Sequence, residues 1–225
     1  AIVCLQETGR QNTDRKIFFS GYSVDEVPVG DTGLGLLIGV RKNIDLVPKV
    51  ILKTENVMAF SIKTIKSKMI VINLYRPPRG PERKQALIAV SDIFRKYEEK
   101  DYKIVAVGDW NSTPQEVSRQ LEKALVNCFT EQVPTKGTRI RKSRRRTSRV
   151  IDFGISNQTS LIKSQTRRRK WNMSDHVPIL VRVEESQKTS LPQRKTIFDR
   201  DLLTNRRVIK EIIKSDHVIS ENSTA

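Results

Sequence analysis

Short apolar runs separated by polar turns recur along residues 1–183, and their lengths are those of strands. The runs GLGLLIGV at 33–40 and KIVAV at 103–107 are continuous, as expected of strands that are buried on both faces. The stretches at 57–65 and 69–75 flank a Lys-Ser-Lys turn and predict a hairpin. We expect strands at 2–5, 33–40, 57–65, 69–75, 103–107, 150–156 and 177–183.

Two segments have helical periodicity. Between residues 82 and 100, apolar side chains repeat at spacings of three and four, namely Leu87, Val90, Phe94 and Tyr97. A second helix is expected after Thr113, a suitable N-cap, because Pro114 fits the first helical position. Its apolar face is predicted to contain Val117, Leu121 and Leu125. Strands, helices and a hairpin together predict an α/β fold with a mixed sheet.

The character of the sequence changes near residue 183. The chain has 225 residues and is 37% apolar, which is enough for one domain with a hydrophobic core. Residues 184–225 are polar and nearly balanced in charge, and we interpret them as a connector or tail with one helix around 202–214. We therefore expect a single domain at 1–183.

The formal net charge is +17, and most of the basic excess lies in one region. From Lys136 to Lys170 there are thirteen Lys or Arg residues and a single acidic residue, Asp152. Charge this concentrated favours contact with a polyanion such as double-stranded DNA, with a solvated loop as the alternative. The residues expected to contact DNA are Arg139, Arg141, Lys142, Arg144, Arg145, Arg146, Arg149, Arg167, Arg168, Arg169 and Lys170.

The small number of Cys and His residues excludes several kinds of site. With two of each, the chain lacks the side chains for a disulfide scaffold or a His-rich metal site. No apolar run approaches the length of a membrane span, so we expect no membrane partner. The chain does contain enough carboxylates for a Mg²⁺ site, together with a histidine that could serve as a catalytic imidazole.

Four polar clusters follow predicted strands, where open α/β sheets place their functional sites. They lie at 6–8, 73–75, 108–111 and 174–176. Each has a simpler explanation when taken alone. Glu7 could be an ordinary exposed carboxylate, Asp109 and Asn111 could form an Asx turn, and His176 could be a surface imidazole.

The order of the clusters is more specific than any one of them. LQET, NLYRPP, GDWN, RVIDF and SDHVPI follow one another along 5–179, and in this order they resemble the exonuclease–endonuclease–phosphatase superfamily, which includes the apurinic-type endonucleases. The resemblance implies a four-layered sandwich of two mixed β-sheets flanked by helices, as in DNase I. Members begin with a strand and an Asn-bearing loop before the LQET strand. We expect both to be missing here, which would leave one position in a sheet empty.

The resemblance also implies roles for single residues. Glu7 resembles the principal Mg²⁺ ligand, with Mn²⁺ as an alternative ion, and Asp175 would lie near the metal. Asp109 would orient or deprotonate the attacking water, and Asn111 would help to hold the phosphate. The remaining roles fall to His176, which would donate to phosphate oxygens, to Asp152, which would fix the imidazole, and to Tyr75, whose hydroxyl would contact the phosphate.

Within the superfamily, the basic stretch before Asp152 and the polar tail resemble the endonuclease domain of a non-LTR retrotransposon. That resemblance implies a nick in double-stranded DNA that leaves a 3′-hydroxyl for reverse transcription. It also implies a reverse transcriptase domain C-terminal in a parent polyprotein. We expect a nuclear location and a monomer.

Two other functions are compatible with the same residues. An apurinic/apyrimidinic repair endonuclease would share the catalytic set and would need an aromatic pocket for the abasic sugar, to which Trp171 could contribute. A catalytically inactive nucleic-acid-binding remnant would keep the basic stretch without turnover. Loss of Mg²⁺-dependent cleavage in a His176→Ala variant would separate an enzyme from such a remnant.

Overall fold

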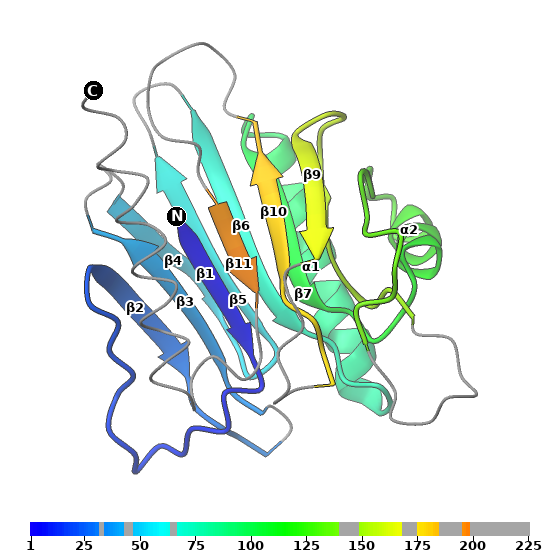
Figure 1. Ribbon diagram of the computed structural model, residues 1–225. Helices are drawn as coiled ribbons and strands as arrows, with labels where there is room; N and C mark the ends of the chain where they lie inside the picture. Colours follow the sequence, from blue (N-terminus) through cyan, green and yellow to red (C-terminus); the bar gives the residue numbers. More distant parts are fainter. Residues whose placement is uncertain are drawn as a thin grey trace.

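Two β-sheets pack face to face in the computed structural model of the chain (Figure 1). The structure describes residues 1–31, 34–42, 47–63, 67–139, 149–167, 175–184 and the backbone of 195–198. All seven predicted strands are present, with ends that differ from the prediction by at most three residues. The mixed α/β sandwich expected from the sequence is thereby confirmed.

The first sheet has six strands in the order β2-β3-β1-β11-β10-β9. Their bounds are β1 Ile2–Gln6, β2 Tyr22–Val27, β3 Leu36–Arg41, β9 Ile162–Arg167, β10 Ile179–Val183 and β11 Lys195–Phe198. Strand β11 pairs parallel to β1 and antiparallel to β10, so it occupies a central position. The expectation of an empty position is therefore wrong for this sheet, and the sheet extends beyond residue 183. The rest of 184–225, including the helix expected at 202–214, lies outside the described residues apart from Glu184.

The second sheet has five strands that follow chain order. They are β4 Val47–Lys53, β5 Val57–Lys63, β6 Lys68–Tyr75, β7 Lys103–Asp109 and β8 Asp152–Ser156. Strands β5 and β6 form the predicted hairpin. Strands β6 and β7 are parallel, and the helix α1, Pro81–Glu98, makes the crossover between them. Parallel pairing brings the carboxyl ends of β6 and β7 to the same edge of the sheet, which is where the polar clusters lie.

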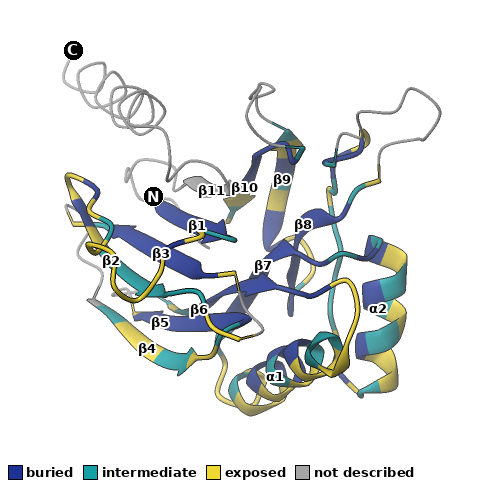
Figure 2. Ribbon diagram, turned by 90° about the horizontal axis from the view of Figure 1, so that it is seen from below, coloured by how far each residue is buried: buried dark blue, intermediate teal, exposed yellow. Residues whose placement is uncertain are grey.

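Three hydrophobic clusters hold these layers together. Side chains from β1 and β3 meet those of β5, β6 and β7 between the sheets, while the other face of the five-stranded sheet packs against α1 and the helix α2, Pro114–Lys123. A smaller cluster around Phe19 and Tyr22 covers the outer face of β1. Central strands are therefore buried on both faces, whereas the helices expose one face to solvent (Figure 2). In the described part of the chain, helices cover only one of the two sheets.

Helix α2 begins as predicted and ends earlier than predicted. The side chain of Thr113 accepts a hydrogen bond from the backbone N–H of Glu116, and Pro114 takes the first helical position. Val117 and Leu121 are buried, but Leu125 is 87% exposed with a φ of 55°. Its assignment to the apolar face was wrong, because the helix has already ended at Lys123. No helix in the described ranges has the length and apolar composition to cross a bilayer.

Candidate active site

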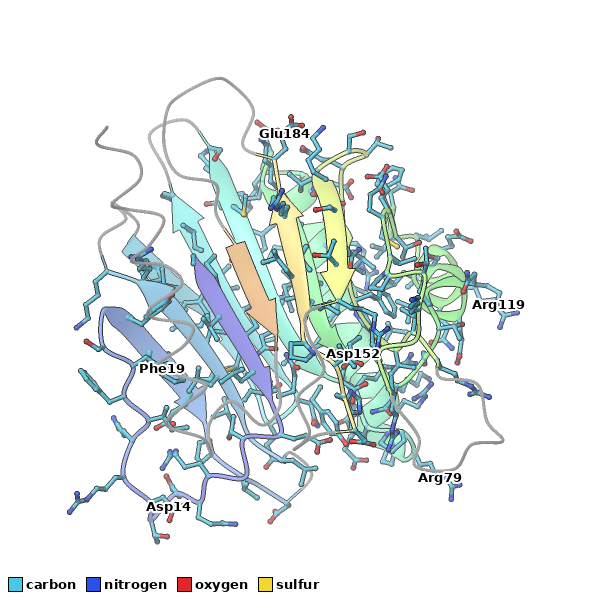
Figure 3. All side chains as sticks on the ribbon, in the orientation of Figure 1. Asp14, Phe19, Arg79, Arg119, Asp152 and Glu184 are labelled. Atoms are coloured by element: carbon cyan, nitrogen blue, oxygen red, sulfur yellow. The ribbon has the colours of Figure 1, made fainter. Side chains whose placement is uncertain are left out.

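The register of the five-stranded sheet aligns three of the predicted site residues. Tyr75 at the end of β6 is the Cα partner of Asp109 at the end of β7, and Asp109 is in turn the partner of Asp152 at the start of β8. All three are buried. In Figure 3, Glu184, which follows β10, lies at the top of the molecule, and Asp152 lies well below it, near the lower end of β9. Strand pairing alone therefore places one phenol and two carboxylates side by side.

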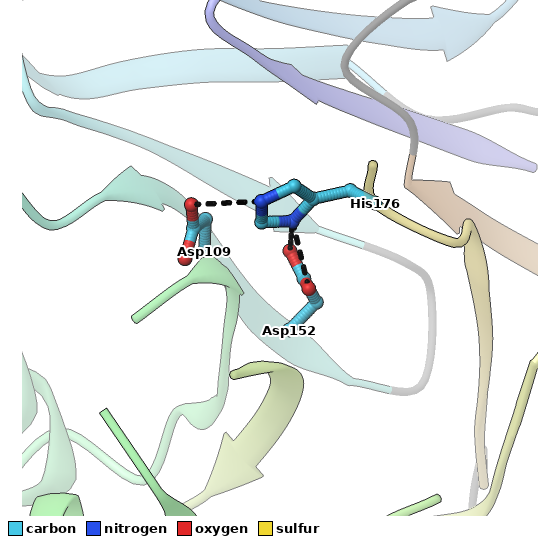
Figure 4. Close-up of side chains that lie close together, drawn as sticks. All are labelled: Asp109, Asp152 and His176. Carbon is cyan, nitrogen blue, oxygen red and sulfur yellow. Dashed lines mark hydrogen bonds and ion pairs between the residues drawn. The ribbon is translucent and has the colours of Figure 1, made fainter. Parts of the chain in front are cut away.

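His176 completes this group from the segment that leads into β10. Its Nδ1 lies 2.9 Å from both carboxylate oxygens of Asp152, and its Nε2 lies 3.9 Å from Oδ2 of Asp109 (Figure 4). The first contact is a hydrogen bond that holds Nδ1–H toward Asp152, and the second is an ion-pair distance. The imidazole thus stands between two buried carboxylates, and its orientation is fixed by one of them.

The charges in this group shift one another's pKa values. Burial alone would lower the pKa of His176, but the negative charge and hydrogen bond of Asp152, with the charge of Asp109, raise it to about 9. Burial raises the pKa of Asp109 to about 7, and the negative charge of Asp152 adds to this, while His176 and the backbone N–H of Asn111 oppose it. The imidazole is therefore a cation at neutral pH, beside a carboxylate that titrates near neutrality.

In the GDWN segment, Gly108 and Trp110 pack against neighbouring parts of the fold, while Asp109 lies at the site. Gly108 lies against β6, where a Cβ atom would come within 1.9 Å of the carbonyl oxygen of Leu74. Trp110 is fully buried on the helix side, stacks on Phe153, and donates from Nε1 to the Phe153 carbonyl at 2.9 Å. Asp109 therefore faces the site while its neighbour anchors the turn in the core.

Asn111 holds the turn from the other side. Its backbone is left-handed, with a φ of 45°, and its backbone N–H donates to Oδ1 of Asp109 at 2.9 Å. Its side-chain amide donates both to Oδ2 of Asp109 and to the carbonyl oxygen of Arg76. Asn tolerates this backbone region better than most residues, which explains an amide here. The predicted pair is brought together, with Asn111 orienting the Asp109 carboxylate.

Two arginines behind this turn were missed by the sequence analysis. Arg76 is 3% exposed, and its guanidinium donates to Ser112 Oγ at 2.9 Å and to Gln120 on α2 at 2.6 Å. Its backbone N–H also donates to the carbonyl oxygen of Asp109. Arg83 on α1 donates to the same Ser112 hydroxyl. Arg76 was visible in the NLYRPP motif, but its role could not be read from the sequence. Only its contacts in the fold show that it links the Asp109 turn to both helices.

Glu7 lies on the other sheet, directly after β1. Its backbone is left-handed, with a φ of 51°, an uncommon conformation for a Glu. The preceding Gln6 donates a hydrogen bond to the side-chain oxygen of Asn73 on β6, and the Asn73 amide donates to the carbonyls of Leu5 and Leu37. Asn73 is fully buried and joins the two sheets two residues before Tyr75. It therefore brings Glu7 to the same edge as Tyr75.

The basic stretch meets the site at Arg139. Its Nε donates to Oδ2 of Asp175 at 2.9 Å, and the residue forms an antiparallel bridge with His176. Arg149 is exposed, and Arg167 ends β9. The other predicted DNA contacts lie outside the described residues, as does Trp171; these contacts are Arg141, Lys142, Arg144, Arg145, Arg146, Arg168, Arg169 and Lys170.

Acidic groups suited to a metal ion occur at this edge. Among the described residues, Asp109, Asp152 and His176 lie close enough together to hold an ion, and Glu7 and Asp175 are outside that group. A cationic imidazole with Nδ1 bonded to Asp152 suits hydrogen-bond donation better than ligation, which needs a neutral ring. Two buried carboxylates that repel each other would gain from a nearby divalent cation, and Mg²⁺ prefers such oxygen ligands. The assignment of Glu7 and Asp175 as ligands stays a prediction.

Several solved structures share the fold of this chain. The endonuclease domain of TRAS1, a telomere-specific non-LTR retrotransposon, has a TM-score of 0.61 and 18% identity over 83% of this chain and 99% of its own. The catalytic domain of Xenopus laevis APE2 has a TM-score of 0.63 and 14% identity, over 81% and 82% of the two chains. The 3′-5′ exonuclease NExo from Neisseria meningitidis gives 0.59 and 16%, over 82% and 89%.

Identities this low show a shared fold. No curated protein matches the chain in sequence. The model of the Endonuclease/Exonuclease/phosphatase family, in contrast, matches residues 1–217, which include both sheets and every residue of the candidate site. The chain therefore belongs to the Endonuclease/Exonuclease/phosphatase family.

Proposed function

We propose that the chain is a Mg²⁺-dependent DNA endonuclease that nicks one strand of duplex DNA and leaves a 3′-hydroxyl. The observation that carries the proposal is the buried imidazolium of His176 between Asp152 and Asp109, within a family of phosphodiester-cleaving and phosphate-releasing enzymes. This arrangement supplies a proton-accepting carboxylate and a cationic donor side by side. Hydrolysis of a phosphodiester needs both.

Asp109 is the group that acts on water in this proposal. With a pKa of about 7, its carboxylate is basic enough to take a proton from water and is still ionised in part at neutral pH. The water oxygen forms a bond to phosphorus, the bond from phosphorus to the 3′-oxygen breaks, and that oxygen takes up a proton. Asn111 keeps the Asp109 carboxylate in one orientation through two hydrogen bonds.

His176 and Tyr75 act on the phosphate. Negative charge grows on the non-bridging oxygens as water attacks, and a cationic imidazole stabilises it by donation from Nε2. Asp152 keeps the ring charged and oriented. Tyr75 stands next to Asp109 in register, and burial with the Asp109 charge raises its pKa, so its hydroxyl stays protonated and can donate to the phosphate.

Mg²⁺ would be held by Glu7, with Asp175 close to it, and when bound it would neutralise phosphate charge. Two observations support this: Glu7 follows Gln6, which is bonded to Asn73, and Asp175 directly precedes His176. Asp175 forms an ion pair with Arg139, and its side chain is 41% exposed. A site of this kind needs only one or two carboxylates, since Mg²⁺ keeps several waters.

The substrate proposed is double-stranded DNA, because residues 136–170, which contain Asp152 and end shortly before His176, carry +12 of the net charge of +17 (thirteen basic residues minus one acidic residue). The likeness to the TRAS1 endonuclease domain supports the retrotransposon branch, in which the 3′-hydroxyl would prime a C-terminal reverse transcriptase. A chromosomal target would require entry to the nucleus. We propose that the domain acts as a monomer.

A repair endonuclease acting at abasic sites is the second candidate, since the fold is equally similar to the catalytic domain of Xenopus laevis APE2. It would use the same catalytic residues and differ in its preference for a lesion. A non-catalytic binding module is a weaker candidate, because Glu7, Asp109, Asn111, Asp152 and His176 are all retained.

The test is nicking of supercoiled plasmid with Mg²⁺ or with EDTA, beside a duplex that carries one abasic site. The proposal expects Mg²⁺-dependent open circles from ordinary plasmid, with their loss in His176→Ala and retention in a variant of the second histidine, His217→Ala. Cleavage of the abasic duplex alone would indicate the repair enzyme. Binding without cleavage of either substrate would contradict an enzymatic function.

A further inference from the structure

Thr138 is fully buried and has four hydrogen bonds, although it lies within the basic stretch from Lys136 to Lys170. Its Oγ1 accepts from the backbone N–H groups of Ile151 and Asp152, both at 3.0 Å. Its backbone N–H donates to the carbonyl of Arg149 at 2.9 Å, and its carbonyl accepts from Val177 at 2.7 Å. The side chain and backbone of this one residue therefore contact two separate segments, 149–152 and the residue Val177.

These two segments carry the two members of the Asp152–His176 pair. Asp152 is bonded directly through its backbone N–H, and Val177 is the residue after His176. Arg139, which follows Thr138, forms an antiparallel β-bridge with His176 itself. Asp152 lies on the five-stranded sheet and His176 leads into the six-stranded sheet, so Thr138 connects the two halves of the pair across the gap between strands.

We propose that Thr138 is a positioning residue for the Asp152–His176 pair, acting by fixing the backbone from which each side chain extends. The Nδ1 atom is equally close to both oxygens of Asp152, an arrangement that a small rotation of either backbone would spoil. Catalytic geometry has to be held within about 0.5 Å, and shifts near 1 Å can cost about 100-fold in rate. This inference rests on the proposed function for its catalytic consequence, but the positioning itself can be measured without turnover.

A hydroxyl is required at this position for a definite physical reason. The backbone N–H groups of Ile151 and Asp152, at the start of β8, both donate to the Oγ1 atom of Thr138. A Val side chain has nearly the same shape without an acceptor, so Thr138→Val would leave two buried donors unsatisfied. The backbone is then expected to shift, and the pair shifts with it. Thr138→Ser keeps the acceptor.

The first measurement is made on the metal-free full chain at a single pH. The imidazole Nδ1–H proton bonded to Asp152 is followed by NMR, and the chain has two histidines, so His217→Gln assigns the spectrum. The inference expects this resonance to move or broaden in Thr138→Val and to stay in place in Thr138→Ser. Thr130→Val is the matched control, because that hydroxyl contacts only Ser118 among the described partners.

The second measurement is the rate of plasmid nicking. Thr138→Val is expected to lower kcat by about 10- to 100-fold with little change in KM, whereas Thr138→Ser keeps most of the rate. If Thr138 acts through the pair, combining Thr138→Val with Asp152→Asn should lower kcat no further than Asp152→Asn alone. Additive losses would indicate a merely structural role and overturn the inference.

The two readouts separate the inference from the proposed function. A wild-type chain that does not nick DNA contradicts the function, while a moved Nδ1–H resonance in Thr138→Val still supports positioning. An unmoved resonance together with full kcat in that variant overturns the inference. If Thr138→Val does not melt cooperatively, Thr138→Cys, with its weaker acceptor, takes its place, and a wild-type resonance in that folded variant overturns the inference as well.

Discussion

The two sheets contribute to one site but are assembled differently. The five-stranded sheet follows chain order and supplies Tyr75, Asp109 and Asp152 from neighbouring strands. The six-stranded sheet places β1 beside β11, so it joins the first and last described segments of the chain. From it come Glu7 at the end of β1 and His176 before β10.

The difference shows which parts of the site are fixed locally. The carboxylates are spaced by the register of paired strands, a short-range constraint that few substitutions can alter without breaking the ladder. The imidazole and Glu7 depend on how one sheet packs on the other. Buried polar side chains make that packing specific: Asn73 links β6 to β1 and β3, and Thr138 links β8 to the segment before β10.

The largest effect is expected at the centre of the five-stranded sheet. Asp109→Asn should lower kcat by roughly 100- to 10,000-fold, because the substituted amide cannot accept a proton from water. It should also raise the melting temperature at pH 8, since burial raises the Asp109 pKa to about 7 and the folded state resists its ionisation. Plasmid nicking and thermal melting measure the two effects. Asp92→Asn on the exposed surface of α1 is the control.

The central strand of the six-stranded sheet provides the next test. Ile197 has Cα partners on both sides, Val3 on β1 and Leu180 on β10. Ile197→Pro removes its backbone N–H from the centre of the sheet and should lower the free energy of unfolding by roughly 3 kcal/mol or more. Urea unfolding measures this, with Ile197→Val as the control. Equal stability of the two variants would contradict the position of β11.

Arg76 tests the fastening of the Asp109 turn. Arg76→Met keeps an apolar stem but loses the bonds to Ser112 and Gln120, so kcat should fall about tenfold as the turn loosens. Arg119→Met, on the exposed face of α2, is the matched change and should keep its rate. A comparison of kcat for the two variants decides whether the cluster around Ser112 matters to catalysis.

The pH dependence of stability reports on His176. Its pKa is raised to about 9 in the folded chain, so the stabilisation is fully present below pH 6.5 and is lost as pH rises through 9. The free energy of unfolding of the metal-free chain should fall across this window, and less steeply in His176→Gln. Urea titrations at pH 6, 7.5 and 9 provide the measurement. If the free energy of unfolding fell equally steeply with pH in the wild type and in His176→Gln, this would argue against a cationic imidazole.

The smallest effect belongs to a single basic residue. Arg149 is exposed where the basic stretch returns to the sheet. If it contacts a phosphate, Arg149→Gln should reduce the slope of log affinity against log salt by about 0.9. Titration of a labelled duplex at several salt concentrations measures the slope, and an unchanged slope would remove Arg149 from the interface.

Much of this structure follows from the sequence where strands are fully buried. The KIVAV run and the GDWN turn predicted β7 and its site residues, because a strand buried on both faces leaves a continuous apolar run. Edge strands carry a weaker signal. Strand β2 reads YSVDEV and β4 contains Pro48, so neither resembles a central strand. Strand β11 is four residues in a polar tail, and only its partners on both sides identify it.

The polar network of the site was predictable only in part. His176 and Asp152 follow from the order of the motifs, but their spacing of 24 residues says nothing about geometry. Thr138 carries no chemical signal of its own and Arg76 in NLYRPP carries only a weak one, since a Thr near a loop and an Arg near a Pro are common. Their roles emerge from contacts over long sequence separations, which depend on the packing of two sheets.

The central position of β11 also has a consequence for the order of folding. Each of the strands β4 to β7 pairs with the next strand in the chain, so this half can form early in synthesis. Strand β1 is made first but reaches its parallel partner only after residue 198 has left the ribosome. Until then, β1 and β10 each have an unpaired edge. Asp109 and Asp152 are already aligned on the five-stranded sheet, but His176 is not yet held beside them. The candidate site would therefore be completed late in synthesis, when β11 joins the sheet.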